Sequence, residues 1–327
     1  MKERETVFRV CVTDDRYGSY AEEQSVLSEI GAQLVVLDLK SEEEAITALR
    51  DADAVLANLF GMSARVIDGM ERCRVISRYG VGYDNVDVEA ATRKGIWVAR
   101  VPDYSIEDVS DHALALLFAC ARKIVYKDRQ IRAGAWNLQK DQPAFRLAGK
   151  TLGLVGFGAI ARCLCRKVSG LGFSQVLVSD PHVPAETIEA AGAVPTTLDT
   201  LVAGSDYISI HVPLLPETRN LIGAAEIAKM KPSATLINTS RGVVVEEMAL
   251  IAALRAGTIG GAGLDVFERE PLPMDNPLRR FNNVVLSDHT GWYSEESIVE
   301  VKTKAAKNVA AVLSGQAPMY PVNTLQK

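Results

Sequence analysis

Short runs of β-branched and apolar residues alternate with segments of helical periodicity along the whole chain. The first hundred residues contain five such runs, FRVCV, QLVVL, AVLAN, RVISR and IWVAR. Between them, segments such as SEEEAITALR and DVEAATRKG repeat their apolar residues at helical spacing. Strands that alternate with helices form a parallel sheet covered by helices on both faces. The sequence therefore predicts an α/β fold.

The alternation is interrupted once and then begins again, which predicts two α/β units. The second series of strands is TLGLV, QVLVS, YISIHV, ATLIN, GAGLDV and NVVLS. Between the two series lies a helical stretch over residues 106–123 that is apolar almost all round, as is typical of a helix buried in a core or a subunit interface. A chain of 327 residues also exceeds the usual size of a single core.

The segment SEESIVEVKTKAAKNVAAVLSG predicts an amphipathic helix after the last strand of the second series. Such a helix can cross back to the first unit, which would make the first domain discontinuous. We expect a discontinuous first domain over residues 1–101 plus 292–327 and a second domain over 102–291, with a cleft between them. The second domain would include the linking helix and an arm, up to about residue 147, that reaches across a dimer.

Composition excludes several classes of protein. The net charge of −5 argues against a nucleic-acid surface, which needs a basic stripe. No apolar run is long enough to span a bilayer, and the N-terminus lacks the apolar region of a signal peptide. The five cysteines are scattered, and the CxC pair Cys163 and Cys165 has no nearby histidine or second pair to complete a zinc site. We expect a cytoplasmic protein without metal, nucleic-acid or membrane partners.

The segment TLGLVGFGAIAR carries the most specific local motif, GxGxxA, between a strand and a helix. Gly156 permits the tight turn, and Gly158 lets a pyrophosphate approach the backbone. The small Ala161 allows the helix to pack closely on the strand, and the helix N-terminus favours the phosphate charge. The motif therefore predicts a dinucleotide site formed by Gly156, Phe157, Gly158, Ala159 and Ile160. The alternative is a tight turn that binds no ligand.

An acidic residue, Asp180, follows the next strand, QVLVS, about 20 residues after the glycine loop. A carboxylate there binds the ribose hydroxyls of the adenosine and repels a 2′-phosphate. The following residues, Pro181 and His182, supply no arginine that would accept NADP. We therefore expect NAD as the cofactor, and we interpret His182 as an exposed loop residue.

Reactive side chains follow three later strands. Arg241 follows ATLIN, Asp265 and Glu270 follow GAGL, and His289 follows VVL. Because the carboxyl ends of the strands line the ligand crevice of an open parallel sheet, these side chains are expected to converge. Taken singly, Arg241 could instead form a surface salt bridge, Glu270 could be a turn residue and His289 a polar cap.

Together these residues suit hydride transfer at a 2-oxo or 2-hydroxy acid. Arginine offers two parallel donors to a carboxylate and an oxo group. Histidine exchanges protons near neutral pH, and Glu270 beside it would orient the ring and raise its pKa. Asp265 is suited to hold the carboxamide or ring region of the nicotinamide. We interpret His112, inside the linking helix, as a packed or capping histidine, because no other polar and reactive residue is near it in the sequence.

These features resemble the D-isomer-specific 2-hydroxyacid dehydrogenase family over nearly the whole chain. The matching segments are RYGVGYDNVD (78–87), VPDYSIEDVSDHALAL (101–116), LGLVGFGAIA (152–161), HVPLLPETRNLI (211–222), INTSRG (237–242), GLDVFEREPL (263–272) and DHTGW (288–292). The resemblance implies two Rossmann-like or flavodoxin-like parallel-sheet domains. Residues 1–101 plus 292–327 would form the substrate domain, and residues 102–291 would form the NAD-binding domain. It also implies a homodimer formed through the helix and arm of residues 104–147.

The resemblance also implies roles for individual residues. Arg241 would bind substrate, Glu270 would pair with His289, and the backbone at Val81 and Gly82 would hold the substrate carboxylate. Asn58 and Leu59, in the loop after the third strand, would face the substrate. The implied cofactor contacts beyond the glycine loop and Asp180 are His211, Val212, Pro213, Thr218, Thr239, Ser240, Asp265, His289 and Gly291.

The sequence departs from the family pattern in places that bear on substrate. Many members have a proline where this chain has Asp288, which would either raise the His289 pKa further or cap the loop. The loop of residues 58–62, NLFGM, lacks an arginine or lysine to grip a phosphate, which weakens phosphoglycerate as a substrate. The chain ends at PVNTLQK, so we expect no regulatory domain of the kind found in longer phosphoglycerate dehydrogenases. Glutamate at 270 argues against a formate dehydrogenase.

Two functions follow from these observations. The first is an NAD-dependent enzyme that interconverts a small 2-oxo acid and its D-2-hydroxy acid. The segment TGWYSEES resembles the branch that includes hydroxypyruvate reductases and C-terminal-binding-protein corepressors more than it resembles the phosphoglycerate dehydrogenase pattern. The alternative is therefore an NAD(H)-sensing binding protein with weak catalysis. The sequence does not identify the acid or the physiological direction.

Overall fold

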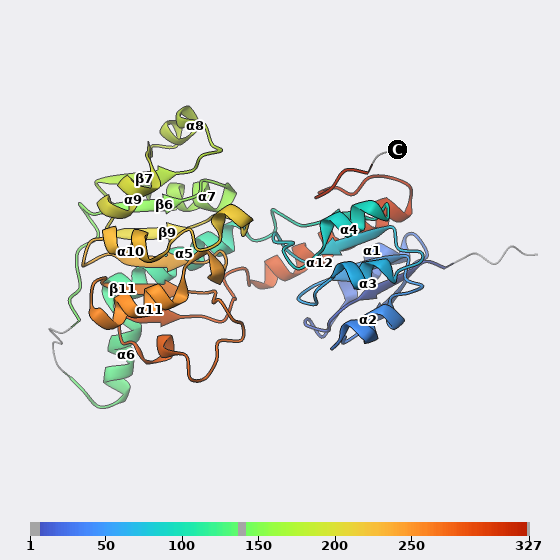
Figure 1. The fold of residues 1–327 in the computed structure, drawn as a ribbon, viewed down its shortest axis with the longest axis horizontal. Helices are drawn as coiled ribbons and strands as arrows, with labels where there is room; N and C mark the ends of the chain where they lie inside the picture. The colour runs from blue at the N-terminus through green and yellow to red at the C-terminus, as the bar shows by residue number, and fades with distance from the viewer. Residues whose placement is uncertain (1–6, 137–141, 326–327) are drawn as a thin grey trace, which may run out of the picture. The chain divides into compact units, whose positions relative to one another are not determined.

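Each run predicted as a strand contains one in the computed structural model, which describes residues 7–136 and 142–325. The chain divides into two units, each built on one parallel sheet. Unit 1 comprises the residues up to Ser105 together with those from Ser294 onward, and unit 2 is Ile106–Tyr293. The prediction of two parallel-sheet α/β units is confirmed (Figure 1).

Unit 1 contains a five-stranded sheet in the order β2-β1-β3-β4-β5. Its strands are β1 (Arg9–Val12), β2 (Gln33–Val36), β3 (Ala54–Ala57), β4 (Val75–Arg78) and β5 (Trp97–Ala99). Its helices are α1 (Ala21–Ser28), α2 (Glu42–Ala48), α3 (Ala64–Asp68), α4 (Val88–Arg93) and α12 (Glu295–Leu313). The chain changes direction across the sheet between β1 and β3, and the loops that follow these two strands therefore flank a topological switch point, where ligands bind in such sheets.

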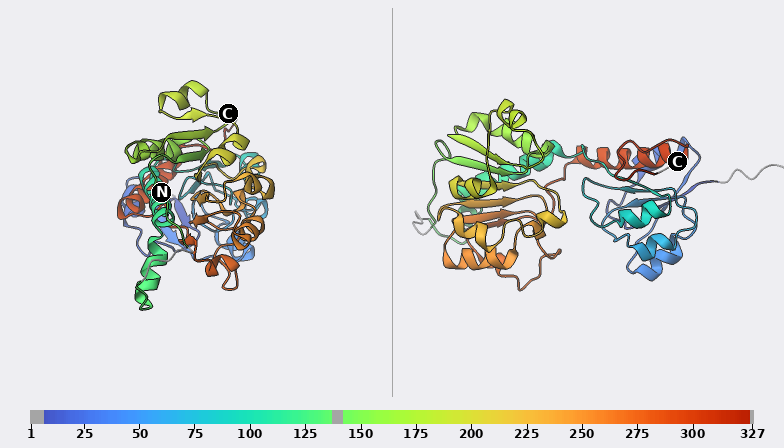
Figure 2. Two further views of the ribbon diagram at one scale, coloured as in Figure 1. Left: turned by 90° about the vertical axis from the view of Figure 1, so that its left-hand side faces the viewer. Right: turned by 45° about the horizontal axis from the view of Figure 1, so that its top comes forward.

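The helix α12 belongs to unit 1 although it lies near the end of the chain (Figure 2). It begins with a capping box, in which the Ser294 hydroxyl accepts the Ser297 N–H and the Ser297 hydroxyl accepts the Ser294 N–H. Its apolar face packs on α1, β3 and β4. The same face carries Lys302, which is 2% exposed and donates to the Ser19 carbonyl at 2.6 Å.

Unit 2 contains a seven-stranded sheet in the order β12-β11-β10-β9-β6-β7-β8. Its strands are β6 (Thr151–Val155), β7 (Gln175–Ser179), β8 (Val194–Pro195), β9 (Tyr207–Ile210), β10 (Thr235–Asn238), β11 (Gly261–Leu264) and β12 (Val284–Leu286). The sequence did not predict β8, because it is two residues long and includes a proline, which strands accept only at an edge. The order reverses between β6 and β9, so the loops after these strands flank the second switch point.

Helices cover both faces of the sheet in unit 2. They are α5 (Ile106–Arg122), α6 (Ile124–Arg132), α7 (Ala159–Val168), α8 (Ala185–Ala190), α9 (Leu198–Gly204), α10 (Ala224–Lys229) and α11 (Glu247–Ala256), with short 3-10 turns at Ser169–Leu171, Pro216–Thr218, Gly242–Val244 and Pro277–Arg280. The predicted linking helix is α5, which packs on β10, β11, β12 and α7. It ends because Lys123 takes a left-handed conformation at φ 57°, and α6 follows directly. Part of the predicted arm, residues 137–141, lies outside the described residues.

The described residues bear on three expected absences. Every cysteine is free and buried. Within residues 7–136 and 142–325, no group of three or more His, Cys, Asp or Glu side chains is arranged to hold a metal ion. The same part of the chain contains no helix long and apolar enough to cross a membrane.

Candidate active site

The glycine loop joins β6 to α7 at the switch point of unit 2. Gly156 has φ +89°, and a Cβ there would lie 2.8 Å from Val212 Cγ1, so only glycine fits this turn. A Cβ built on Gly158, by contrast, meets nothing within 4 Å. Gly158 is the residue before the first turn of α7, and Ala161 is buried against the core. The loop therefore leaves open space at a helix N-terminus, which fits a pyrophosphate.

Asp180 follows β7 and is tied to the glycine loop. Its Oδ2 accepts the N–H of Phe157 at 2.7 Å, and its Oδ1 accepts the N–H of His182 at 2.8 Å. These bonds hold the carboxylate beside the loop, where a ribose would follow the pyrophosphate. His182 is exposed. The residues present thus fit an adenosine dinucleotide.

The segment after β9 lies against the glycine loop through His211 and Val212. His211 Nε2 is 2.9 Å from Ser209 Oγ, and burial lowers the pKa of the ring to about 4. His211 is therefore neutral at neutral pH and is unsuited to serve as the acid–base group. Thr218 closes the following turn, because its hydroxyl donates to the Pro213 carbonyl at 2.6 Å.

The segment after β10 carries one polar atom without a partner among the described residues, the buried hydroxyl of Thr239. A buried hydroxyl usually has a hydrogen bond, so this one marks a place where a ligand can supply it. Ser240 is already engaged, since its hydroxyl donates to Asn238 Oδ1 at 2.9 Å. Of these two predicted cofactor contacts, Thr239 is the one left available by the protein.

His289 and Glu270 form the predicted dyad. His289 Nδ1 lies 2.7 Å from Glu270 Oε2, while Glu270 Oε1 accepts the Phe267 N–H at 3.0 Å. Burial raises the Glu270 pKa, but the hydrogen bond with His289 and the positive charges of His289 and Arg241 outweigh it, and the pKa is lowered. An ionised carboxylate only accepts, so Nδ1 carries the hydrogen and Nε2 remains for a substrate.

Arg241 follows β10 at the same edge of the sheet. Its Nη1 donates to the Ser240 carbonyl at 2.8 Å, and the Asn238 side-chain amide donates to the Arg241 carbonyl at 2.9 Å. A Cβ on Gly242 would lie 1.8 Å from the carbonyl carbon of Phe267. This close approach brings the chain after β10 against the chain after β11. The guanidinium therefore lies near enough to Glu270 to lower its pKa.

Asp265 is 2% exposed and holds the loop that carries His289. Its Oδ1 accepts the Ser287 hydroxyl at 2.7 Å and the Thr290 N–H at 3.0 Å, and its Oδ2 accepts the Gly291 N–H at 2.9 Å. Burial raises the Asp265 pKa, but hydrogen bonds from His112, Ser287 and Gly291 outweigh it and lower the pKa to about 2. Asp265 is thus an ionised carboxylate inside the protein.

His112 is a residue of this network that the sequence did not reveal. Its Nε2 lies 2.7 Å from Ser287 Oγ and 3.3 Å from Asp265 Oδ1. These partners are remote from His112 in the sequence and come next to it because α5 packs on β11 and β12. The sequence held one indication of this contact. Asp265 and Ser287 follow two strands, β11 and β12, which pair in the parallel sheet, and His112 lies in the helix that packs on them.

Asp288 offers a test of the two roles considered for it. Its Oδ1 accepts the Thr290 hydroxyl at 2.9 Å, and its side chain is exposed. This contact agrees with the prediction that Asp288 caps the loop, which was the alternative to raising the His289 pKa.

Unit 1 places the predicted substrate loop, residues 58–62, at its own switch point after β3. Asp14, after β1, accepts the Leu59 N–H at 3.0 Å, and the Asn85 side-chain amide donates to the carbonyls of Asn58 and Phe60, both at 2.9 Å. Leu59 is 58% exposed, whereas Asn58 is 3% exposed. Asp14 and Asn85 position the loop, and the sequence alone did not single them out.

Unit 1 also contains the backbone at Val81 and Gly82 and the side-chain amide of Asn58, which were predicted to face the substrate. Val81 and Gly82, in the loop after β4, are half-buried. The Asn58 Nδ2 atom is buried and has no partner within the described part of the chain.

Comparison with known proteins identifies the family. The model of the "D-isomer specific 2-hydroxyacid dehydrogenase, NAD binding domain" matches residues 114–291, which is more than half of the chain. The chain belongs to the D-isomer specific 2-hydroxyacid dehydrogenase family. The matched range lies within unit 2 of this dehydrogenase.

Relatives agree with this assignment. The dehydrogenase is 39% identical to the glyoxylate reductase of Korarchaeum cryptofilum over 288 residues, 86% of each chain. It is 38% identical to the D-3-phosphoglycerate dehydrogenase of Methanocaldococcus jannaschii over 300 residues, which are 91% of this chain and 56% of that protein. The D-lactate dehydrogenase of Aquifex aeolicus, solved with NAD and lactic acid, shares 28% identity at a TM-score of 0.84, covering 94% of this chain and 96% of that one. The family resemblance is confirmed, and the chain is an oxidoreductase with a nicotinamide dinucleotide cofactor.

Proposed function

We propose that this dehydrogenase interconverts a small 2-oxo acid and its D-2-hydroxy acid, with His289 as the acid–base group. The hydrogen bond between His289 Nδ1 and Glu270 Oε2, at 2.7 Å, carries the proposal. It directs Nε2 away from the carboxylate and stabilises the ring when it is protonated. His289 Nε2 then donates a proton to the carbonyl oxygen in reduction and accepts it in oxidation. A bound nicotinamide dinucleotide supplies or accepts the hydride.

Arg241 is proposed to bind the substrate carboxylate and oxo oxygen. Its planar guanidinium suits two parallel bonds to these oxygens. In unit 1, the main-chain N–H groups at Val81 and Gly82 are proposed to bind the carboxylate, and Asn58 and Leu59 to contact the rest of the acid. The buried Asn58 Nδ2 has no partner among the described residues, and Leu59 presents an exposed apolar side chain.

The glycine loop and Asp180 are proposed to bind the adenosine half of NAD. The Thr239 hydroxyl, which has no partner among the described residues, and the Asp265 carboxylate are proposed to contact the nicotinamide half. The remaining proposed contacts are His211, Val212, Pro213, Thr218, Ser240, His289 and Gly291. Asp180 favours NAD over NADP, because its charge would lie where NADP carries a phosphate.

The substrate class is proposed to be a small unphosphorylated acid such as glyoxylate. The similar reductase from Korarchaeum cryptofilum is named for glyoxylate. The loop of residues 58–62 carries no arginine or lysine to neutralise a phosphate. Its first exposed side chain, Leu59, is apolar.

Oxidation of NADH by the purified chain tests the function and the substrate class together. The panel is glyoxylate, hydroxypyruvate, pyruvate, 2-oxobutyrate, 2-oxoisocaproate and phosphohydroxypyruvate, each repeated with NADPH. We expect turnover of a small unphosphorylated acid and preference for NADH. Preference for phosphohydroxypyruvate would contradict the proposed substrate, and preference for NADPH would contradict the role of Asp180. NADH binding without any turnover would contradict the catalytic proposal itself.

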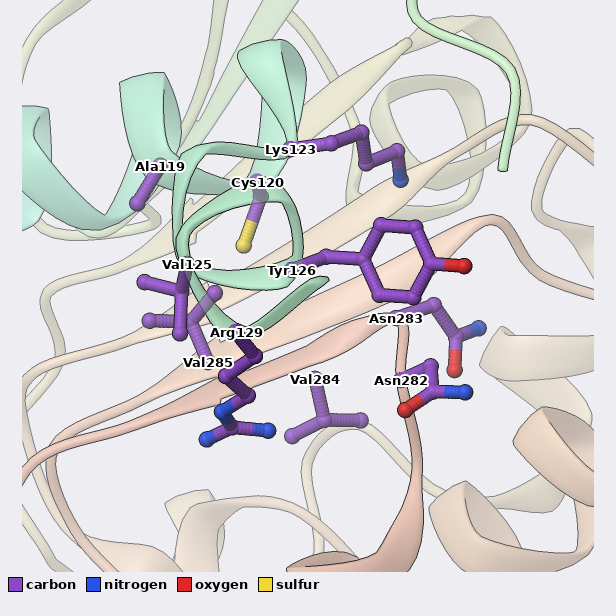
Figure 3. Close-up of a pocket in the computed structure, with 10 residues that line it drawn as sticks. All are labelled: Ala119, Cys120, Lys123, Val125, Tyr126, Arg129, Asn282, Asn283, Val284 and Val285. Atoms are coloured by element: carbon purple, nitrogen blue, oxygen red, sulfur yellow. The ribbon is translucent and has the colours of Figure 1, made fainter. Parts of the chain in front are cut away.

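We also propose that the protein is a homodimer through α5, α6 and the arm after them. Ile124, Ile131 and Trp136 are 58%, 51% and 89% exposed on this part of unit 2, and a second copy of the chain would cover this apolar surface. Figure 3 shows the small pocket that α6 borders, with Tyr126 and Arg129 on one side and the start of β12 on the other.

Light scattering after size-exclusion chromatography tests the dimer. Ile131→Asp is expected to halve the mass, because a charge cannot be buried in an apolar interface. Met248→Asp is the matched control, since Met248 is 68% exposed on α11 and its change leaves the proposed face intact. An unchanged mass for Ile131→Asp, or a monomeric parent, would remove the proposed interface.

A further inference from the structure

His112 occupies an unusual place for a helix residue, because it meets the ends of two strands. It lies within α5, which packs on β11 and β12. Ser287 directly follows β12, and Asp265 directly follows β11. His112 Nε2 is 2.7 Å from Ser287 Oγ and 3.3 Å from Asp265 Oδ1. One helix side chain thus contacts both segments that precede the loop carrying His289.

The direction of these hydrogen bonds follows from counting hydrogens. The Ser287 hydroxyl has one hydrogen, which it donates to Asp265 Oδ1 at 2.7 Å. Asp265, with a pKa of about 2, can only accept. Ser287 therefore accepts from His112, so that His112 Nε2 must carry a hydrogen. Both the neutral Nε2–H tautomer and the imidazolium meet this condition, and the arrangement does not depend on the charge of His112.

On its other side, Asp265 accepts three consecutive main-chain N–H groups. The N–H of His289 donates to the Asp265 carbonyl at 2.8 Å, that of Thr290 to Oδ1 at 3.0 Å, and that of Gly291 to Oδ2 at 2.9 Å. His289 itself has φ +58°, a left-handed conformation that costs a non-glycine residue about 1–2 kcal/mol. Its surroundings must therefore hold it there, and Asp265 makes the bonds that do so.

The His112 ring also packs directly on this loop. A Cβ on Gly291 would lie 2.8 Å from Asp265 Oδ2 and 3.3 Å from His112 Cδ2, closer than ordinary van der Waals contact. The absence of a side chain at 291 thus lets the loop close on both the carboxylate and the imidazole.

We propose that His112 and Ser287 are positioning residues for proton transfer. They hold the Asp265 carboxylate in the orientation that clamps residues 289–291, and the clamp keeps His289 aligned with Glu270 and the substrate. The inference rests on the proposed acid–base role of His289. It adds a histidine, remote in the sequence, whose contribution is to geometry and which does not touch the reacting atoms.

Steady-state kinetics of two single variants and their double variant tests the proposal with glyoxylate, or with the best acid of the panel. His112→Phe keeps the ring but cannot donate, and Ser287→Ala removes the bridge. Each is expected to lower kcat by about 10- to 100-fold, the scale of a small misplacement of a reacting group. The KM for the acid is expected to change by less than about three-fold, since Arg241 is untouched. The double variant should be no slower than the slower single variant, because both act through one carboxylate.

Two further variants separate positioning from folding. His112→Gln places an amide N–H where Nε2 stands and is expected to recover kcat to within about five-fold of the parent. Ser110→Ala lies on the same helix and breaks hydrogen bonds with Cys163 and Lys167, so that it perturbs α5 on the α7 side alone. Ser110→Ala is expected to keep the parent kcat while its Tm falls by about as much as that of His112→Phe.

The outcomes distinguish this inference from the proposed function. A His112→Phe variant as fast as Ser110→Ala, or a His112→Gln variant as slow as His112→Phe, would overturn the positioning role. If that outcome is found while His289→Ala is inactive in the same assays, the positioning inference fails and the proposed function stands. If His289→Ala turns over at the parent rate, the proposed function fails and the inference fails with it.

Discussion

The two loops proposed to act on the substrate are anchored in opposite ways. In unit 2, residues 289–291 are clamped by Asp265, a carboxylate that is 2% exposed and ionised. In unit 1, residues 58–60 are held at the backbone by the half-buried Asp14 and by the neutral amide of Asn85. The buried anchor bonds the main chain of residues 289–291, and Glu270 bonds the catalytic side chain of His289 itself. The anchors in unit 1 hold main-chain atoms and leave the Leu59 side chain exposed.

The difference separates the parts of the dehydrogenase that must be constant from those that can vary. Hydrogen bonds to an ionised buried group are strong, and breaking one leaves a charge without compensation. In unit 1 the hydrogen bonds reach backbone atoms and so tolerate a change of side chain at the residue they hold, whereas in unit 2 Glu270 also holds the His289 side chain. We therefore expect variants of the unit 2 loop to abolish chemistry and variants of the unit 1 loop to alter substrate preference.

The largest expected effect is that of His289→Ala. Loss of the proposed acid–base group should lower kcat by about 10²–10⁴-fold, because proton transfer to the carbonyl oxygen then relies on water. NADH affinity, measured by fluorescence titration, should change little, since the glycine loop and Asp180 are intact. His182→Ala is the matched control at an exposed histidine. A parent-like kcat for His289→Ala would remove the distinction between the two loops.

Asp265→Asn should show that the unit 2 anchor is ionised. The folded-state pKa of about 2 lies below the ordinary aspartate value of 3.8, so ionisation of Asp265 stabilises the fold above the unfolded pKa, and this stability is lost as the pH falls towards 2. The shift corresponds to about 2 kcal/mol at neutral pH. The difference in unfolding free energy between parent and variant, from urea titrations, should be constant between pH 7 and 5.

The same difference should fall to about half near pH 3, where the unfolded carboxyl is mostly protonated. Asp288→Asn is the control, because Asp288 is exposed and only caps the loop through Thr290. A parent–variant difference that stays constant down to pH 3 would show that Asp265 is not ionised in the fold.

The sequence predicted the contacts that follow from strand order and missed those that form only when separate segments pack together. Strand periodicity located the two sheets, and parallel strands bring their carboxyl ends to one edge, so Arg241, Glu270 and His289 could be grouped in advance. The glycine loop and Asp180 followed from their spacing. The partners of His112 were not predicted, because Ser287 and Asp265 become its neighbours only when α5 packs on β11 and β12. Asp14 and Asn85 were missed for a similar reason, since a side chain that binds backbone atoms of another segment leaves no pattern in the sequence.

Asn85→Ala should produce a smaller effect of a different kind. The amide donates to the carbonyls of Asn58 and Phe60, and each lost bond costs about 1 kcal/mol. A looser loop should raise the KM for the 2-oxo acid by about three- to ten-fold while kcat falls by less than about three-fold. Gln24→Ala, at an exposed site on α1, is the control. A loss mainly in kcat would show that the unit 1 loop, like its counterpart, governs chemistry.

The smallest effect on the simplest substrate is expected from Leu59→Ala. Leu59 is 58% exposed and is held only through its backbone, so its truncation should leave the loop in place. Turnover of glyoxylate, which has no side chain to contact, should stay within about three-fold of the parent. Turnover of 2-oxoisocaproate should fall by about ten-fold, because a hydrophobic contact of a few methylenes contributes about 1–3 kcal/mol. Met319 is another exposed apolar residue of unit 1, and Met319→Ala should change the turnover of neither acid. Equal losses for both acids would mean that Leu59 supports the loop itself, and the unit 1 loop would then be as intolerant of side-chain change as the one that carries His289.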